Sequence, residues 1–580
     1  MNDVPNAPWF RYYGEVAHTL DYPDVSMSEM IERSGERYAD YKALYFMGRE
    51  TTFRELCEQI DRCAKGLRAL GIKENDRITI CMPNCPQGVV MFYAVNMIGA
   101  VANMIHPLSG EGEIVFYLKD AESRVVLTLD QFYPKFVSIG TKVEIARLIV
   151  ANVGEALKPL MRLGYQVTEG RKIAPVPKTD ARVILWRDLM KLGETYQGSY
   201  RVRRKGADPA VILYSGGTTG TTKGILLSNL NFNALALQII NMAHCFKAGH
   251  KMLAVMPMFH GFGLGCSIHA VLVGGSQCLL IPRFNAKTYA ELIKKHRPNY
   301  IVGVPTLYEA LLRNPAMDGV DLSCLLGVFS GGDSLSVELK KKFDAFLAEH
   351  GAKVQVREGY GTTECVTASC LTPYFTSREG SIGIPMPDMY YKIVYLGTTD
   401  EAVCGEEGEI CITGPTLMMG YVNQPEETNQ TLRRHSDGRI WLHTGDLGVM
   451  DTDGFVYFHQ RIKRMIVTSG YSVYPSQLEN VMDSHEKVMM SCFIGVPDPY
   501  KVQKIKAFVM LKPGVEPTEE LRQELFAHCR TNIARYAQPY EIEFREELPK
   551  TLVGKVAFRI LENEELAKIE AEKSGESTES

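Results

Sequence analysis

The stretch Tyr214-Ser-Gly-Gly-Thr-Thr-Gly-Thr-Thr-Lys-Gly224 follows directly on Asp208–Tyr214, a largely apolar run that predicts a buried strand. Its glycines allow backbone N–H groups to turn toward an anion, its hydroxyls add hydrogen-bond donors, and Lys223 adds a positive charge. The spacing is not that of a Walker A loop, Gly-x-x-x-x-Gly-Lys-Ser/Thr. The stretch therefore predicts a loop that binds a polyphosphate after a strand of an α/β sheet.

On both sides of this loop, helical patterns alternate with short apolar strands, as in a doubly wound α/β sheet. The alternation runs from about residue 50 to Arg124–Leu129 and resumes from Asp208 to Leu325–Gly332, so we expect two related sheets. After residue 380 the sequence changes to strands and turns typical of a small β-rich unit. A last α/β segment begins near residue 464 and ends in a polar tail that we expect to fray.

One uncharged stretch, Gly88–Ile105, is long enough to raise the question of a membrane span. Two Asn and two Gly interrupt it. Helical periodicity up to Ile98, a break at Gly99 and the run AVANMI favour a buried helix that leads into a buried strand.

The composition is that of a globular protein: 45% of the 580 residues are hydrophobic and 23% are charged. Because 64 Lys and Arg stand against 68 Asp and Glu, the net charge of −4 excludes a general attraction to nucleic acid. The 14 cysteines include no CxxC pair and no zinc-type quartet of Cys and His, and the N-terminus lacks the pattern of a signal peptide. We therefore expect reduced thiols in a cytoplasmic protein.

The segment Lys158–Lys205 is the one basic region, with 12 Lys or Arg against four Asp or Glu. Two interpretations remain open. It is either a solvated insertion or a surface that contacts membrane phospholipid or an acidic partner.

The Tyr214–Gly224 stretch resembles the phosphate-binding signature of the adenylate-forming (AMP-binding) superfamily. Its Gly-Gly-Thr-Thr-Gly form is similar to that of bacterial medium- and long-chain fatty acyl-CoA synthetases. Segments that resemble six further motifs of the superfamily follow in order, and the resemblance covers residues 30 to 560. These segments are Met256–Gly261, Ser330–Leu335, Tyr360–Glu364, Thr444–Asp446, Arg461–Lys463 and Pro549–Lys555.

The resemblance implies an α/β fold with a large N-terminal domain, residues 1–460, made of two α/β subdomains and a distorted β-barrel. It further implies a hinge at residues 461–463 and a small, mobile α+β C-terminal domain, residues 464–580. The small domain would alternate between an adenylating and a thioester-forming arrangement.

The resemblance also implies a nucleotide site. Tyr360 would offer its ring to adenine, Asp446 would accept hydrogen bonds from the ribose hydroxyls, and Glu364 with Thr219 would hold Mg²⁺. The full set of expected nucleotide-binding residues is Thr218, Thr219, Gly220, Thr221, Thr222, Lys223, Gly331, Gly332, Asp333, Tyr360, Gly361, Thr362, Asp446 and Arg461.

Catalytic roles are implied for Lys555, Thr363, Glu364 and His260, and Lys463 would serve the hinge. Lys555 would reach the α-phosphate when the small domain closes. His260 has three interpretations: a packed core residue, a gate between the carboxylate and thiol pockets, or a general base for the thiol. Ser469, Gly470 and Tyr471 would approach coenzyme A, whereas Val467 stands where some relatives carry Lys.

We therefore expect an ATP-dependent ligase that uses Mg²⁺ and coenzyme A and passes through an acyl-adenylate, with a medium- or long-chain fatty acid as substrate. The grounds for the fatty acid are the loop, the basic region and the small residues of His260–Gly265, which we expect to line an apolar tunnel. The alternatives are an aryl or bile-type acid, a carrier protein as acceptor, a luciferase-type oxygenase and a catalytically silent nucleotide-binding regulator. We expect a monomer or homodimer in the cytoplasm, with no nucleic-acid partner and with peripheral membrane contact through the basic region.

Overall fold

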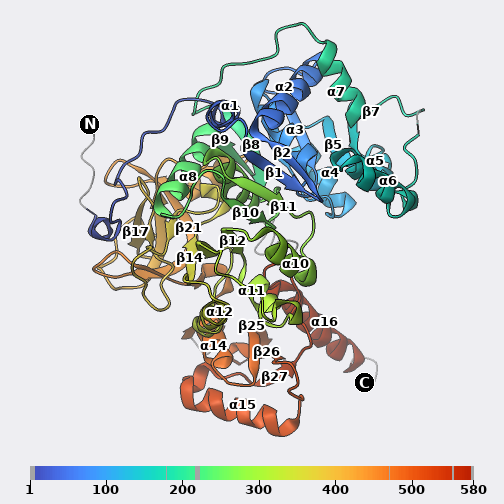
Figure 1. Ribbon diagram of the computed structural model, residues 1–580. Helices are drawn as coiled ribbons and strands as arrows, with labels where there is room; N and C mark the ends of the chain where they lie inside the picture. Colours follow the sequence, from blue (N-terminus) through green and yellow to red (C-terminus); the bar gives the residue numbers. More distant parts are fainter. Residues whose placement is uncertain are drawn as a thin grey trace.

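The computed structural model describes residues 7–177, 179–215, 222–468, 471–498, 500–551 and 554–576. Its strands form four sheets. Two large sheets with helices make up most of the chain, a β-rich unit adjoins them, and a small C-terminal unit, coloured orange to red, stands apart from both (Figure 1).

An eight-stranded sheet carries the loop that the sequence analysis singled out. Its order is β19-β9-β8-β4-β3-β5-β6-β7. The strands from β8 through β7 pair in parallel, whereas β9 turns back antiparallel on β8 and pairs Tyr214 with Gly224. The loop therefore joins two strands that pair with each other. The bounds are β3 (Arg77–Cys81), β4 (Val101–Met104), β5 (Val125–Leu129), β6 (Arg147–Ala151), β7 (Val183–Leu185), β8 (Pro209–Tyr214), β9 (Gly224–Ser228) and β19 (Gly420–Tyr421).

A nine-stranded sheet has the order β16-β15-β14-β13-β12-β10-β11-β1-β2. Its strands from β14 through β1 are parallel neighbours, so the loops after β13 and β14 leave the same edge. The bounds are β1 (Lys42–Phe46), β2 (Arg49–Thr52), β10 (Lys251–Ala254), β11 (Gln277–Leu280), β12 (Tyr300–Gly303), β13 (Gly327–Ser330), β14 (Val356–Tyr360), β15 (Cys370–Leu371) and β16 (Ile384–Pro385).

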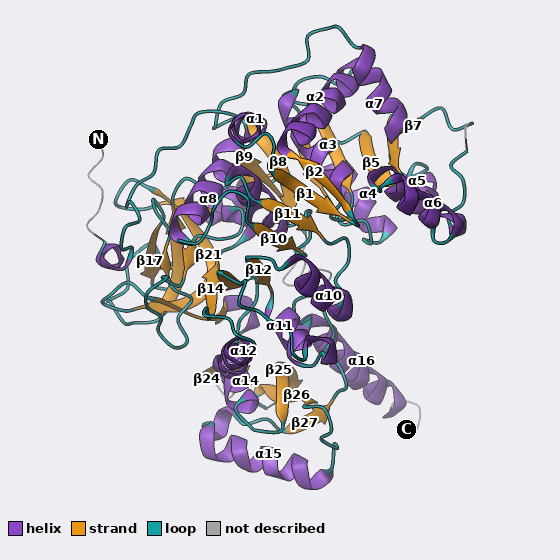
Figure 2. Cartoon of the chain, in the orientation of Figure 1, coloured by secondary structure: helices purple, strands orange, loops and turns teal. Residues whose placement is uncertain are grey.

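Helices lie between and around these sheets (Figure 2). Helix α3 packs on β3 and β4 as well as on α1 and α2, and α2 in turn contacts β1. The helices of this part are α1 (Met27–Arg37), α2 (Phe53–Ala69), α3 (Pro86–Met97), α4 (Glu111–Asp120), α5 (Tyr133–Ile139), α6 (Pro159–Val167), α7 (Trp186–Thr195), α8 (Asn229–Met242), α9 (Ala270–Val273), α10 (Ala286–His296), α11 (Pro305–Leu312) and α12 (Val337–Glu349).

The uncharged stretch Gly88–Ile105 has the predicted form. Helix α3 ends at Met97, Gly99 takes a left-handed φ of 75°, and β4 follows. Every residue of α3 from Gln87 onward is buried, because the helix lies between protein layers. Within the ranges that the structure describes, no helix is both long and apolar enough to cross a membrane.

The β-rich unit is a five-stranded antiparallel sheet with the order β17-β18-β21-β20, in which β22 also pairs with β21. It corresponds to the distorted β-barrel that the sequence predicts. Its elements are β17 (Tyr390–Val394), β18 (Gly408–Thr413), β20 (Leu432–Arg434), β21 (Ile440–Met450), β22 (Val456–Arg461) and α13 (Pro425–Thr431), the last of which packs on β19, β20 and β21.

The small C-terminal unit has its own sheet, with the order β24-β23-β26-β25 and β27 parallel to β26. Its apolar core is separate from that of the rest of the chain. A second cluster joins it to Leu339 of α12. Its elements are β23 (Ile466–Thr468), β24 (Tyr471–Val473), β25 (Val488–Asp498), β26 (Val502–Leu511), β27 (Glu541–Phe544), α14 (Pro475–Asp483), α15 (Glu519–Asn532) and α16 (Phe558–Glu576).

The basic region is not one solvated insertion. Its second half builds the fold, since β7 pairs with β6 and α7 packs on α2. Here Arg182 pairs with Asp180 and Arg204 with Glu74, so these charges are compensated within the protein. Lys178 lies outside the described residues. The surface feature that remains is the segment around α6.

Candidate active site

The loop between β8 and β9 is closed at its base. The backbone N–H of Ser215 donates to the Lys223 carbonyl (3.2 Å), and the Lys223 N–H donates to Ser215 Oγ (3.3 Å). Of the residues predicted to bind phosphate, Thr218, Thr219, Gly220 and Thr221 lie outside the described residues. Thr222 and Lys223 are described, and both are half-buried.

Lys223 is engaged with residues that the sequence analysis did not identify. Its ammonium group pairs with Glu427 of α13 and lies 4.7 Å from the centre of the Tyr421 ring. The Tyr421 hydroxyl in turn donates to Glu364 Oε1 (2.9 Å). Strand β19 adds to the edge of β9 through only two residues, which is too short for a periodicity argument to find. Tyr421 thus links the phosphate loop to the predicted metal ligand.

Asp446, in β21, is the most enclosed carboxylate of the predicted site, with 2% of its surface exposed. Tyr360 donates its hydroxyl to Asp446 Oδ2 (2.6 Å), and Arg461, directly opposite on β22, brings Nε to 3.4 Å from Oδ1. Burial raises the pKa of Asp446, while the charge of Arg461 opposes that shift. Oδ1 is buried and accepts no hydrogen bond within the described part of the chain. An acceptor left open in this way fits the hydroxyls of a ribose.

The loops after β13 and β14 form the floor of the site. Gly332 takes a left-handed φ of 81°, and a Cβ at Gly361 would lie 1.9 Å from the Thr367 carbonyl oxygen, so only glycine fits there. Thr362 is buried and Thr363 is half-buried at the start of a short 3₁₀ turn that ends at Cys365. This edge of the sheet therefore brings together the Ser330–Leu335 and Tyr360–Glu364 motifs.

Lys555 of the small C-terminal unit reaches this floor. A Cβ added at Gly332 would lie 3.6 Å from Lys555 Cε, so the lysine side chain runs along the glycine turn. Burial lowers the pKa of Lys555, and three carboxylates oppose the shift: Asp333, Asp446 and Glu364. The predicted catalytic lysine and the predicted nucleotide-binding acids therefore share one electrostatic environment.

Two hydrogen bonds hold the lysine loop in this position. Thr306, in the first turn of α11, donates its hydroxyl to the Gly554 carbonyl (2.6 Å), and the Val556 N–H donates to Asp333 Oδ2 (3.3 Å). The sequence analysis did not identify Thr306, because nothing in the local pattern of α11 marks one threonine as a contact to a residue some 250 positions away. The structure thus has the small unit docked with Lys555 in the site.

His260 lies where the loop after β10 enters a π-helical segment, Phe262–His269. Its Nδ1 accepts a hydrogen bond from the Phe262 N–H (3.2 Å). Burial, assisted by the charge of Lys555, lowers the pKa of His260 to about 3, so the ring is neutral at pH 7. Because Nδ1 accepts, the ring proton lies on Nε2. Because the Nδ1 lone pair is already engaged by a backbone N–H, the ring has no free lone pair to take a proton, which does not favour the general-base interpretation.

An apolar pocket lies behind the glycine turns, between α8, the π-helical segment and the ends of β12, β13 and β14. Phe262 and Cys266 contribute its wall from the π-helical side. The glycines of His260–Gly265 do not line it, contrary to the sequence expectation. A Cβ at Gly261 would lie 1.7 Å from the Val366 carbonyl oxygen and one at Gly263 would lie 2.1 Å from that of Pro257. These glycines therefore permit close backbone packing.

The predicted hinge and coenzyme A residues are partly described. Arg461 ends β22, and residues 462–464 form a short 3₁₀ turn that leads into β23. The backbone of Lys463 belongs to this turn, but its side chain lies outside the description, as do Ser469 and Gly470. Tyr471 is described, and its ring stacks on Tyr536 of the same unit, with 4.3 Å between the ring centres. Their roles stay predictions.

The AMP-binding enzyme family matches residues 31–422, and the AMP-binding enzyme C-terminal domain matches residues 477–555. The long-chain-fatty-acid–CoA ligase of Bacillus subtilis (strain 168) is 34% identical over 564 residues, which cover 96% of this chain and 98% of that relative. The ligase of the same name from Salmonella typhimurium is 30% identical over 577 residues, 97% of this chain and 98% of that relative. Among solved structures, the anthranilate CoA ligase AuaEII in complex with anthranoyl-AMP matches with a TM-score of 0.81 at 25% identity, over 95% of this chain and 99% of that chain.

Proposed function

The chain belongs to the AMP-binding enzyme family, and from this premise we propose that it is an ATP-dependent ligase that joins a fatty acid to coenzyme A. In the first step a carboxylate oxygen attacks the α-phosphorus of ATP, the bond to the β-phosphate breaks and pyrophosphate leaves. In the second step the thiol of coenzyme A attacks the acyl carbon, and AMP leaves. The observation that carries the proposal is the apolar pocket that opens at Gly331 and Gly332, the turn along which Lys555 lies.

The residues of the site suit the first step. Asp446 holds the ribose through its open oxygen, and Tyr360 offers its ring to adenine beside it. Lys555 places a positive charge where the α-phosphate and the fatty carboxylate meet, which offsets the negative charge that develops there. Neutral His260 donates Nε2–H toward the same carboxylate and orients it.

We include Mg²⁺ in the proposal because Glu364 supplies the hard carboxylate oxygen that this ion prefers. Bound there, Mg²⁺ would neutralise charge on the phosphates of ATP. Tyr421 keeps the carboxylate in place through its hydrogen bond to Oε1. Thr219 is the second proposed ligand.

For the second step we propose that the small unit rotates about residues 461–463. Lys555 then leaves, and the segment Ser469–Tyr471 approaches the pantetheine arm of coenzyme A. A rotation of this kind breaks the contacts of the docked arrangement: the two hydrogen bonds of the lysine loop, those from Tyr474 to Glu407 and from Ser476 to the His459 carbonyl, and the apolar cluster with Leu339.

A pyrophosphate-release panel tests the substrate. The purified protein is given ATP, Mg²⁺, coenzyme A and acids from acetate to oleate, together with benzoate, cinnamate and cholate. We expect the fastest release with medium- or long-chain acids, because the pocket wall is apolar. Faster turnover of benzoate or cinnamate than of palmitate would favour the aryl-acid alternative. Ala243→Leu, which adds three carbons to the pocket wall, should shift the preference to shorter chains and leave the KM for ATP unchanged.

Lys555→Ala tests the mechanism. Removing one preorganised group that stabilises transition-state charge slows a reaction by about 10²- to 10³-fold. We expect a loss of this size in pyrophosphate release, and no such loss in the matched variant Lys550→Ala, a lysine of the same motif. An adenylation rate in Lys555→Ala equal to that of the wild type would overturn the assignment.

We also propose that the α6 face, Leu160, Leu163 and Val167, contacts an anionic membrane surface. These side chains stand on one side of the helix, at spacings of three and four residues, and are 81%, 61% and 71% exposed. Exposed basic side chains flank them: Lys158, Arg162, Arg171 and Lys172. An apolar face bordered by positive charge is the arrangement that inserts shallowly among anionic lipids.

Vesicle flotation tests this contact. The wild type should float with vesicles that contain phosphatidylglycerol at low salt and less at high salt, because the charge attraction is screened. Leu160→Ser combined with Leu163→Ser should abolish flotation, whereas Leu396→Ser, which changes a similarly exposed leucine elsewhere, should not. Failure of the wild type to float at low salt would remove the proposal and leave the ligase assignment untouched. In solution we expect a monomer or homodimer.

A further inference from the structure

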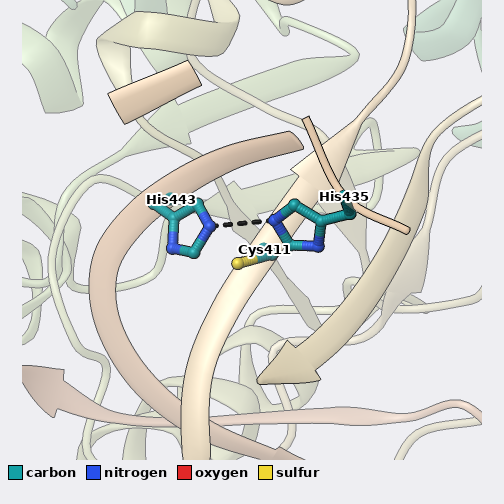
Figure 3. Close-up of side chains that lie close together, drawn as sticks. All are labelled: Cys411, His435 and His443. Carbon is teal, nitrogen blue, oxygen red and sulfur yellow. Dashed lines mark hydrogen bonds between the residues drawn. The ribbon is translucent and has the colours of Figure 1, made fainter. Parts of the chain in front are cut away.

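Cys411, His435 and His443 bring one sulfur and two imidazole rings together inside the β-rich unit (Figure 3). All three side chains are buried, and their ligand atoms lie within 4.8 Å of one another. Nε2 of His435 and Nε2 of His443 are 2.9 Å apart. In Figure 3 the sulfur of Cys411 lies beside both rings, near the gap that the dashed line crosses. The nucleotide chemistry described above uses none of the three.

The fold places these residues together. Cys411 on β18 and His443 on β21 are direct cross-strand partners in an antiparallel pair, so their side chains leave the same face of the sheet. His435 follows β20 in the tight turn to β21, where its N–H donates to the Arg439 carbonyl (3.0 Å). Backbone pairing therefore fixes all three positions.

The hydrogen bonds around the rings leave a lone pair on His443 Nε2, which accepts from the Nε2–H of His435. His443 Nδ1 lies 2.8 Å from Glu409 Oε2, and because a carboxylate only accepts, the His443 proton is on Nδ1 and its Nε2 carries a lone pair. His435 Nδ1 is buried and has no hydrogen-bond partner among the described residues. A histidine whose second nitrogen donates to a carboxylate is the usual arrangement of a metal-binding histidine.

We propose that Cys411, His435 and His443 form a binding site for Zn²⁺, with Glu409 orienting His443. One thiolate and two imidazoles are the ligand types that this ion prefers. On binding, the Cys411 thiol gives its proton to solvent and the proton of His435 moves from Nε2 to Nδ1, so that both Nε2 atoms and the sulfur face the metal. The exchange releases one proton and changes no oxidation state.

The geometry requires only small movements. In tetrahedral zinc coordination two nitrogen ligands are separated by about 3.3 Å, and a nitrogen and a sulfur by about 3.6 Å. The two imidazoles therefore move apart by about 0.4 Å, and the sulfur approaches the rings by about 1.2 Å at most. The turn Ser436–Gly438 above the cluster is exposed, so a metal ion enters without passing through the core.

Zinc retention by the full-length protein tests the site. The protein is stripped with a chelator, incubated with zinc chloride alone, desalted and analysed for bound zinc by mass spectrometry. We expect about one zinc per chain in the wild type and a loss of that zinc in Cys411→Ser and in His435→Gln. Cys63→Ser, which changes an equally buried thiol in α2 that belongs to no such cluster, should retain it.

Two further measurements separate binding from misfolding. Co²⁺ substituted at the site should give visible absorption with a sulfur-to-metal band that Cys411→Ser lacks. Glu409→Gln should weaken zinc affinity by about 10- to 100-fold in a competition titration, as expected for a group that orients a ligand. Because His435 is buried, the fold of metal-free His435→Gln is checked by circular dichroism, and loss of zinc with the wild-type spectrum retained assigns the loss to the missing ligand.

The proposal is wrong if the wild type retains no zinc, or if His435→Gln retains as much as the wild type. Neither readout depends on ligase activity, so failure here leaves the proposed function standing.

Discussion

Thr306 offers the sharpest test of how the docked arrangement controls the first step. Its hydroxyl donates to the Gly554 carbonyl across the interface between α11 and the lysine loop, at 2.6 Å and largely shielded from water. Valine has nearly the shape of threonine and a similar helix propensity. Thr306→Val therefore removes this hydrogen bond with little other change.

The size of the expected effect follows from the free energy that one hydrogen bond contributes. A neutral intramolecular hydrogen bond contributes about 0.5 to 1.5 kcal/mol, which corresponds to a factor of about 2 to 12 in an equilibrium constant. The bond exists only while Lys555 is docked. The variant should therefore shift the small unit away from the docked arrangement by this factor.

Single-turnover kinetics measure the consequence. Release of pyrophosphate, for which Lys555 is the proposed catalytic residue, should slow by about 2- to 12-fold in Thr306→Val, whereas transfer from preformed acyl-adenylate to coenzyme A should not slow. Thr306→Ser keeps the hydroxyl and should behave as the wild type. If Thr306→Val released pyrophosphate at the wild-type rate, or slowed both steps equally, the docked arrangement would not be the one that adenylates.

Three further perturbations follow from the described contacts. Asp446→Asn replaces the charged acceptor of the proposed ribose contact and should raise the KM for ATP by about 10- to 100-fold, measured by steady-state kinetics, with unchanged KM values arguing against the contact. Gly261→Ala places a Cβ 1.7 Å from the Val366 carbonyl oxygen, and it should lower the free energy of unfolding in urea by about 1 to 3 kcal/mol or more. The control Gly112→Ala, in α4, should be neutral or slightly stabilising because a Cβ there meets nothing within 4 Å. Burial raises the pKa of Asp483 to about 8. Between about pH 4 and pH 8 the native state therefore keeps a proton that the unfolded chain has lost, so the contribution of Asp483 to the free energy of unfolding declines over that range. Asp483→Asn should flatten this decline in pH-dependent urea melts, and an unchanged slope would contradict the assignment.

Sequence reasoning predicted the parts of the fold that local pattern controls. The alternation of helices and strands indicated two sheets, and the break at Gly99 separated α3 from β4 as expected. The motifs at Ser330–Leu335 and Tyr360–Glu364 follow β13 and β14, which are parallel neighbours, so their coming together was foreseeable once the strands were recognised.

Contacts between distant segments could not be predicted in this way. Tyr421 reaches Glu364 only because a two-residue strand adds to β9, and Thr306 meets Gly554 only because the small unit docks on α11. In the basic region, Lys158–Lys205, composition did not indicate which charged side chains are buried. A run of positive charge looks solvated in sequence, but whether Arg204 is solvated depends on Glu74, which is 130 positions away.

The carboxylate of Glu409 contacts both the proposed zinc site and the turn that precedes Asp446 in the proposed nucleotide site. Glu409 accepts from His443 through Oε2 and from the Gly445 N–H through Oε1 (2.9 Å), and Gly445 holds a left-handed φ of 72° immediately before Asp446. The carboxylate therefore supports a backbone conformation that ordinary residues disfavour, directly before Asp446, the proposed ribose ligand.

A metal bound at the proposed site would fix the His443 imidazole, and through it the orientation of Glu409 and the Gly445 turn. ATP held by Asp446 as proposed would fix the same turn from the other side. Because binding free energies are reciprocal, any factor by which zinc raises the affinity for ATP must also be the factor by which ATP raises the affinity for zinc. A factor greater than one in the wild type that disappears in Glu409→Gln would identify its carboxylate as the link, and a factor unchanged in that variant would exclude it.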